Sequence, residues 1–319
     1  MMGCLSPAPA PSPPPTSYPG CYSGNKLNIT ISTIGTVARE ELERAGQASV
    51  IGRTSRGLYL HLASDWVVFL SFGPYRGPLT LNLHGNPETF ADLGIGTEVY
   101  CSDGFISFPS KHLTLPLAQA ASWQAAEPAG KALSSDLLQA GLLSVLHLAA
   151  QGYPDRRLVA LLHGMISGQP ALEPSDPVFY PPLRRLQAAC QEGPADAIVS
   201  ALEGLLGLGP GLTPSGDDLV MGFLLAMSRW SQRASSQEAA FYSQQLLPSL
   251  HRLTGHLSAS LITCAGRGQA DERLIQALDG LVTGSLEAEA CVRALSTWGS
   301  SSGFDALAGM VIFLMPGQS

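Results

Sequence analysis

The chain divides into two parts with different hydrophobic patterns, and this division limits the folds open to it. Over residues 26–117, short apolar and β-branched runs alternate with turn residues such as Gly, Pro, Asn, Asp and Ser. Such runs at close spacing are typical of a small antiparallel barrel or sandwich. Over residues 135–319, apolar residues recur at intervals of three and four, as in amphipathic helices of a bundle. The sequence therefore predicts an α+β protein, with a small antiparallel β-rich domain (26–117), a linker (118–134) and an α-helical bundle domain (135–319).

The N-terminal residues and the composition limit location and partners. Residues 1–25 are rich in Pro, Ser and small side chains, so we expect a disordered Pro-rich tail without the basic start and apolar segment of a signal peptide. No uninterrupted apolar run approaches the roughly 20 residues that a transmembrane helix needs. The formal net charge of −7 argues against a nucleic-acid surface, and six scattered cysteines without a C-x-x-C pair argue against a zinc ribbon. These features predict a cytoplasmic protein that binds neither nucleic acid nor membrane.

One glycine-rich stretch leads directly into an apolar helix. Residues 207–218 read G-L-G-P-G-L-T-P-S-G-D-D, and an apolar helix is expected from Ser215 onward. Glycines such as Gly209 and Gly211 allow a ligand to approach the main chain closely. A helix start carries unpaired N–H groups and a partial positive charge, which favour anions. The stretch therefore predicts an anion site at a helix N-terminus.

The start of this helix is repeated near the C-terminus. Ser215–Gly222 and Ser302–Gly309 share the pattern S-G-x-D-x-x-x-G, and an apolar helix follows each. If the repeat is structural, two helix N-termini of similar build face one another, and each offers a Ser hydroxyl, a Gly and a carboxylate. The alternative is a pair of ordinary capped core helices, since a Ser cap contributes about 1 kcal/mol without any function.

Two adjacent carboxylates at the first helix start need an explanation. Asp218 fits a capping box with Ser215, which leaves Asp217 without a structural role. Two carboxylates beside an anion repel it unless a metal ion bridges them, and Mg²⁺ takes one or two protein carboxylates plus substrate oxygens. Asp217 and Asp218 are therefore possible Mg²⁺ ligands, and Asp305 adds a third carboxylate. If Asp217 is functional, Asp217→Asn abolishes ligand binding at an unchanged melting temperature; if it is structural, the variant unfolds.

Two arginines are candidates for holding a substrate anion. Arg76 lies between two Gly-Pro pairs in the stretch 73–78, and Arg267 follows a helix end in the stretch 264–268. A guanidinium group binds carboxylate or phosphate in bidentate fashion. The alternatives are a rigid hairpin connection with a solvated Arg76, and a helix C-cap with a dipole-compatible Arg267.

Other cofactor motifs do not appear. The loop lacks the Gly-Lys-Ser/Thr end of a P-loop, and Leu212 stands where a G-x-G-x-x-G fingerprint needs its third glycine, so we expect no nucleotide or flavin. The seven histidines show no metal-ligand spacing. His251 and His256 would not share a helix face, and nothing selects His61 or His84 in the β-rich part.

The two motifs together resemble the AllH-like family, which is named for a subunit associated with oxamate carbamoyltransferase in bacterial allantoin breakdown. Family members read G-x-G-P-G-L-T-P-S-x-D-D-x-L-x-G and, near the C-terminus, G-H-[ST]-S-G-x-D-x-L-x-G. Here the first motif departs only at Val220, which replaces Leu, and the second at Ser300, where the family often has His. If that His assists chemistry or binds substrate, the present chain has a changed substrate or weaker activity.

The resemblance implies a function and a set of roles. It implies a carbamoyltransferase subunit that catalyses a reaction of the type oxalurate plus phosphate to oxamate plus carbamoyl phosphate, with partner subunits of which one resembles the succinyl-CoA synthetase α subunit. Asp217, Asp218 and Asp305 would be catalytic, by holding Mg²⁺ or orienting the nucleophilic amide. The substrate would be bound by Gly209, Gly211, Thr213, Ser215, Gly216, Ser302, Gly303 and either Arg76 or Arg267. Two alternatives stay open: a non-catalytic ligand-binding or scaffolding subunit, and a Mg²⁺-dependent hydrolase with paired aspartates.

Overall fold

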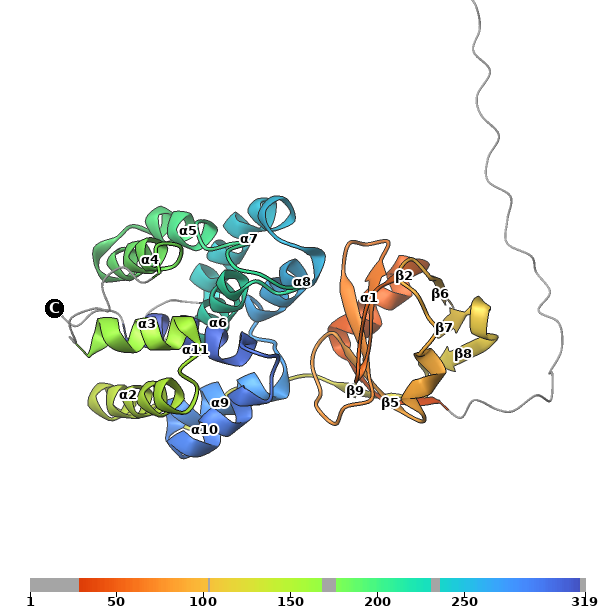
Figure 1. Cartoon of the computed structure of the whole chain (residues 1–319), viewed down its shortest axis with the longest axis horizontal. Helices are drawn as coiled ribbons and strands as arrows, with labels where there is room; N and C mark the ends of the chain where they lie inside the picture. The colour runs from red at the N-terminus through yellow and green to blue at the C-terminus, as the bar shows by residue number, and fades with distance from the viewer. Residues whose placement is uncertain (1–28, 103, 168–175, 231–235, 316–319) are drawn as a thin grey trace, which may run out of the picture.

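The computed structural model describes residues 29–102, 104–167, 176–230 and 236–315. The Pro-rich tail predicted for residues 1–25 lies outside the described residues. A curled mixed sheet comes first in the chain, and a helical region follows it (Figure 1). The predicted α+β class is therefore confirmed.

Nine strands form one sheet in the order β8-β7-β6-β2-β3-β4-β5-β1-β9. The strands are β1 (Thr30–Gly35), β2 (Gln47–Thr54), β3 (Gly57–Leu62), β4 (Val67–Ser71), β5 (Thr80–His84), β6 (Glu98–Ser102), β7 (Phe105–Phe108), β8 (Leu113–Pro116) and β9 (Ala121–Trp123). Helix α1 (Thr36–Ala45) and the short 3₁₀ turns η1 (Pro87–Phe90) and η2 (Pro109–Lys111) complete this part. In β3, Leu58, Leu60 and Leu62 are fully buried and alternate with half-buried side chains, as a sheet with one covered face requires.

The sheet is mixed rather than purely antiparallel, which corrects the expected strand pattern. β5 runs parallel to β4, and β9, within the predicted linker, runs parallel to β1. The chain between β4 and β5 does not turn back as a hairpin but crosses over before it pairs again. The Asn82 side-chain amide donates hydrogen bonds to the carbonyls of Gly73 (3.0 Å) and Tyr75 (2.8 Å), and these bonds fix the crossover loop.

Ten helices follow in the described part of the chain. They are α2 (Ser135–Gly152), α3 (Arg157–Ile166), α4 (Tyr180–Glu192), α5 (Ala195–Glu203), α6 (Ser215–Trp230), α7 (Ser236–Leu253), α8 (His256–Ala265), α9 (Glu272–Thr283), α10 (Ala288–Ser296) and α11 (Ser302–Leu314). Their buried side chains form one continuous hydrophobic core. None of these helices has both the length and the apolar character of a membrane span.

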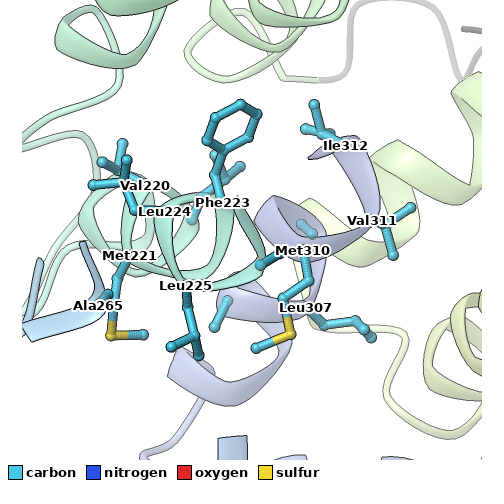
Figure 2. Close-up of a cluster of buried hydrophobic side chains, with 14 of the residues drawn as sticks. Val220, Met221, Phe223, Leu224, Leu225, Ala265, Leu307, Met310, Val311 and Ile312 are labelled. Atoms are coloured by element: carbon cyan, nitrogen blue, oxygen red, sulfur yellow. The ribbon is translucent and has the colours of Figure 1, made fainter. Parts of the chain in front are cut away.

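Helices α6 and α11 lie at the centre of this core. Apolar side chains such as Phe223 and Met310 surround both helices (Figure 2). A helix that is apolar on all sides is buried on all sides, which is the position both helices take. The two helices cross in backbone contact, because a Cβ on Gly222 would lie 2.0 Å from the carbonyl oxygen of Ala306, and a Cβ on Gly309 would lie 2.0 Å from that of Leu219.

The sheet and the helical region meet along a small apolar junction. Val37 and Leu79 from the β-rich part are buried against Cys264 of α8, with Trp66 and Leu261 packed beside them. α8 lies at the edge of the helical region that faces the sheet (Figure 1). This junction brings the loops before α6 and α11 next to the sheet.

Candidate functional site at two helix N-termini

The starts of α6 and α11 meet, and their side chains cross from one helix to the other. The Ser302 hydroxyl of α11 faces Asp218 of α6 and lowers the pKa of its carboxyl, while the Ser215 hydroxyl of α6 acts in the same way on Asp305 of α11. Thr213, just before α6, places its Oγ1 3.3 Å from the Oγ of Ser302. The sequence repeat is therefore structural, and the expectation that two similar helix N-termini face one another is confirmed.

This exchange replaces the capping box expected within α6. Asp218 does not serve mainly to cap its own helix with Ser215, since both side chains turn to α11. The pattern S-x-x-D suggests partners within one helix, although the partners of Ser215 and Asp218 are Asp305 and Ser302 in the second copy of the repeat.

The second residue of each helix must be glycine for reasons of packing. A Cβ on Gly216 would lie 2.0 Å from the carbonyl oxygen of Leu205, and a Cβ on Gly303 would lie 2.1 Å from that of Leu295. Each helix start therefore presses against the end of the preceding helical segment. Gly216 and Gly303 were predicted as substrate-binding residues, but their position gives them a structural role.

The same close packing satisfies most amides at the two helix starts. The N–H groups of Gly216 and Gly303 donate to Leu208 O (2.9 Å) and Trp298 O (3.0 Å). Those of the two following residues donate to Pro214 in α6 and to Ser301 in α11. Within the described segments around both helices, the amides of Ser215 and Ser302 are left without a hydrogen bond. Each helix start thus keeps one free donor of the kind that binds an anion.

Asp218 and Asp305 form a buried carboxyl pair with raised proton affinity. Both are 2% exposed, and in each the Oδ2 atom is buried without a hydrogen-bond partner. Burial raises the pKa of Asp218 well above its ordinary value, and the neighbouring charge of Asp305 raises it further, although the Ser302 and Thr213 hydroxyls lower it. Burial also raises the pKa of Asp305, from 3.8 to about 6, against the lowering effect of the Ser301 and Ser215 hydroxyls. Burial therefore makes both carboxyl groups harder to ionise than a solvated aspartate.

Asp217 points elsewhere and has a structural explanation that sequence reasoning did not find. Its Oδ1 accepts a hydrogen bond from the Gly207 N–H (2.7 Å), and its Oδ2 accepts one from the Thr254 hydroxyl. The carboxylate thus fastens the glycine-rich loop to the end of α7. Because both oxygens are used, Asp217 and Asp218 do not offer Mg²⁺ a shared pair of free ligands.

We expect Asp217→Asn to destabilise the fold by about 2 kcal/mol, since both partners donate to a buried carboxylate, and the amide is an uncharged group that offers only one acceptor oxygen. Urea denaturation measures the change, and Asp196→Asn on the exposed first turn of α5 is the matched control. A variant that keeps its stability and loses only ligand binding would restore a functional role for Asp217.

The two helix starts open on a cavity between the sheet and the helical region. Its volume is about 700 Å³. Thr213, Gly299 and Ser302 form part of its helical wall. On the opposite side it is lined by strand and loop residues, which include Tyr59, Phe69, Ser71, Gly73 and Tyr75. Of the predicted binding residues, Thr213 and Ser302 therefore reach the cavity.

The glycines of the loop shape the chain rather than line the cavity. Gly207, Gly209 and Gly211 have φ values of 74°, 109° and 109°, a region that favours glycine. A Cβ on Gly209 would also lie 3.0 Å from the Ser215 nitrogen. Neither Gly209 nor Gly211 belongs to the cavity wall, so their contribution is the loop conformation that brings Thr213 to it.

The arginines at the cavity are not the two that the sequence pointed to. Arg76 forms an ion pair with Glu272 (2.7 Å), and Arg267 lies over the Trp66 ring; neither lines the cavity. Arg56, at the tip of the β2–β3 hairpin, and Arg273, in α9, do line it.

Arg273 is fixed on all sides. It makes two hydrogen bonds of 2.8 Å to the Asp271 carboxylate and one to the Thr297 carbonyl, and it lies 3.9 Å from the centroid of the Tyr75 ring. Asp271 is two residues away, but Tyr75, in the loop between β4 and β5, and Thr297, at the end of α10, are distant in the sequence, so the local sequence does not place Arg273 at the cavity.

The fold and site define an α+β protein with a cavity bounded on one side by a mixed sheet and on the other by two related helix N-termini. Residues 205–314 match the family described as oxamate carbamoyltransferase subunit AllH, so the resemblance stated from the two motifs is confirmed over that segment. By this description the family is a subunit of an enzyme complex, oxamate carbamoyltransferase. The matched segment includes α6 to α11 and leaves the sheet outside. No curated protein and no solved structure matches the chain.

Proposed function

We propose that the chain is an AllH-type subunit of a carbamoyltransferase that acts on a small carboxylate or amide, and that the cavity binds phosphate or carbamoyl phosphate. The reaction is of the type oxalurate plus phosphate to oxamate plus carbamoyl phosphate. The observation that carries the proposal is the meeting of two helix N-termini at one cavity of about 700 Å³. Two positive helix ends and two hydroxyl groups suit an anion of phosphate size.

Each group at the cavity has a defined task in this reaction. The Thr213 and Ser302 hydroxyls and the free Ser302 amide donate hydrogen bonds to a phosphate or carbamoyl oxygen, and they stabilise the negative charge that develops when phosphate attacks the carbamoyl carbon. Arg56 supplies positive charge for the substrate carboxylate in place of Arg76 and Arg267, while Arg273, already bound by Asp271 and Thr297, shapes the cavity wall. Positioning of the two reactants supplies much of the rate.

The buried carboxyl pair provides the proton that the leaving group needs. When the bond between the carbamoyl carbon and the oxamate nitrogen breaks, that nitrogen takes up a proton, and the attacking hydrogen phosphate gives up the proton that restores the pair. Asp218 contacts the Ser302 and Thr213 hydroxyls, which line the cavity, so a proton can pass from the pair through a hydroxyl. A carboxyl with a pKa of about 6, as in Asp305, suits proton exchange near neutral pH.

The participation of Mg²⁺ in the reaction is a separate proposal. If a metal ion takes part, Asp218 and Asp305 would hold it without Asp217, whose oxygens are both bonded. Phosphate-dependent turnover that survives a chelator would favour the proton role of the pair, and turnover lost with the chelator and restored by Mg²⁺ would favour the metal role.

The decisive experiment is phosphate-dependent cleavage of oxalurate, measured with the chain alone and with its partner subunits. We expect the double variant Thr213→Val/Ser302→Ala to lose about 100-fold in turnover, the effect of removing preorganised oxyanion donors. The matched control is Thr114→Val/Ser107→Ala, which removes another hydroxyl pair 3.3 Å apart on the solvent-facing side of strands β7 and β8.

The outcomes separate the possible roles. Activity of the control but not of the double variant supports the cavity as the active site. Binding of carbamoyl phosphate by the chain without turnover in any complex would instead make it a ligand-binding or scaffolding subunit. Metal-dependent hydrolysis that needs no phosphate would favour the hydrolase alternative.

A further inference from the structure

A second group of functional side chains lies where the sheet meets α8. It consists of His61 in β3, Asp65 in the turn after β3, and His256, the first residue of α8. The His61 Nε2 lies 3.4 Å from the Asp65 Oδ1, and the His256 Nδ1 lies 3.8 Å from the same oxygen. The ligand atoms of all three residues lie within 4.8 Å of one another. Two imidazoles and one carboxylate therefore converge on one point.

The backbone holds the three residues in place from both parts of the protein. The turn between β3 and β4 is closed by hydrogen bonds from Asp65 N to Leu62 O (3.0 Å) and from Leu62 N to Trp66 O (2.8 Å), and it puts Asp65 in the left-handed region with φ 64°. On the helical side, Ser260 accepts a hydrogen bond from Val67 N (3.0 Å) and donates one to His256 O (2.7 Å). The first turn of α8 is thus tied to the start of β4.

The cluster also contains an unsatisfied polar atom. The Nε2 of His61 is buried and has no hydrogen-bond partner. The centroids of the His61 and His256 rings lie 4.3 Å apart. The Nδ1 of His256 is a second imidazole nitrogen near the Asp65 carboxylate. A buried polar atom without a partner is costly, and a metal ion would satisfy it.

We propose that His61, Asp65 and His256 bind a divalent transition-metal ion of the zinc class. Zn²⁺ takes imidazole nitrogen and carboxylate oxygen at about 2.0–2.1 Å, which puts neighbouring ligand atoms of a tetrahedral site roughly 3.3 Å apart. The two contacts to Asp65, 3.4 and 3.8 Å, are close to this spacing. Mg²⁺ fits poorly, because it prefers oxygen ligands in octahedral geometry.

The fourth coordination position would be open. A cavity of about 290 Å³ is lined by His61 and Asp65 together with Glu98 and Tyr100. Water or a small ligand therefore has access to the metal, as in sites with three protein ligands. Because the ligands come from the sheet and from α8, the ion would link the two walls of the larger cavity, which Val67 and Leu257 also line.

The sequence could not reveal this site from spacing. His61 lies in β3 and His256 begins α8, so six strands and six α-helices of the described chain separate them and no short H-x-x-H pattern links them. The proposal is also independent of the carbamoyl-transfer function, since it uses none of the residues at the N-termini of α6 and α11.

The test uses the full chain after chelator treatment, with Zn²⁺ affinity measured by competition with a chromophoric chelator and Co²⁺ binding followed by visible absorption. We expect one ion per chain and a rise in melting temperature with Zn²⁺ but not with Mg²⁺. His256→Ala and Asp65→Asn, both at exposed side chains, should each weaken binding roughly 100-fold, because two ligands hold the ion far less well than three.

Two control variants test whether a loss of Zn²⁺ binding is specific to the proposed ligands. His84→Ala removes an exposed histidine elsewhere in the sheet, and His147→Ala/His163→Ala removes the other close histidine pair, whose nitrogens lie 3.3 Å apart. Both controls should bind Zn²⁺ like the parent chain. Binding that is unchanged in His256→Ala and Asp65→Asn, binding lost in the His147/His163 variant, or no binding at all would overturn the proposal.

Discussion

Gly222→Ala is expected to destabilise the protein by at least about 3 kcal/mol, since inserted atoms in a packed core force the backbone to move. The added Cβ would lie 2.0 Å from the carbonyl oxygen of Ala306 and 2.6 Å from its carbon, so α6 and α11 would have to separate. No side chain can give way there, because the contact is with backbone. Gly309→Ala should have the same effect, since its Cβ would lie 2.0 Å from the Leu219 carbonyl oxygen.

Urea denaturation of both variants measures this loss, and Gly141→Ala is the matched control. Gly141 lies within α2, and a Cβ there meets nothing within 4 Å. In a helix interior the change from Gly to Ala should stabilise by about 0.5–1 kcal/mol. The same substitution is therefore expected to act in opposite directions at two helical glycines. A Gly222→Ala variant as stable as the parent would mean that the two helices are not in backbone contact.

Loss of this contact should also disrupt the candidate site, because the contact sets the distance between the two helix starts. Ser215 and Ser302 reach the opposite carboxyl groups only while α6 and α11 stay crossed. A folded Gly222→Ala variant should thus lose phosphate-dependent activity even though Gly222 lies about two turns inside its helix. This result would connect the core packing to the chemistry at the cavity.

The repeat could be found in the sequence because its parts are local. The pattern S-G-x-D-x-x-x-G contains a helix start, a close-packed glycine and the glycine at which the two helices cross. All three lie within eight residues, so a short stretch of sequence is enough to identify them. The two copies then predicted the facing of α6 and α11, which the structure confirms. The α+β class followed for a similar reason, since strand and helix periods are visible in single segments.

The roles of Asp217 and Arg273 and the pairing of β4 with β5 depend on contacts between residues that are distant in the sequence. Asp217 was expected to lack a structural role, but its partner Thr254 stands 37 residues away. Arg273 was missed because Tyr75 and Thr297 hold it from different elements, whereas Arg76, which local turn residues favoured, is paired with Glu272. The parallel pairing of β4 with β5 was missed because the Gly-Pro pairs of the connecting loop suit a hairpin equally well.

The stability of the parent chain relative to Asp305→Asn should fall by about 3 kcal/mol as the pH rises from 4 to 7, because a pKa raised from 3.8 to about 6 corresponds to 1.36 kcal/mol per unit. The carboxyl is 2% exposed, so solvent does not screen this effect strongly. Below pH 4 the side chain is protonated in both the folded and the unfolded chain. Between pH 4 and 6 it loses its proton in the unfolded chain alone, and the folded state therefore loses stability as the pH rises. Above pH 6 both states are ionised and the difference is constant.

Urea denaturation of both proteins at intervals from pH 4 to 8 measures the difference, and Asp136→Asn, at the exposed start of α2, is the control with no expected pH dependence of this size. Ser215→Ala sharpens the test. The Ser215 hydroxyl lowers the pKa of Asp305, so its removal should move the upper end of the pH window to a higher value. A difference that stays constant with pH, or one that grows in favour of the parent chain, would mean that Asp305 is held as a carboxylate, with the Arg156 charge outweighing burial. In that case the pair could not supply the proton that the leaving nitrogen requires, and the proposed mechanism would need another acid.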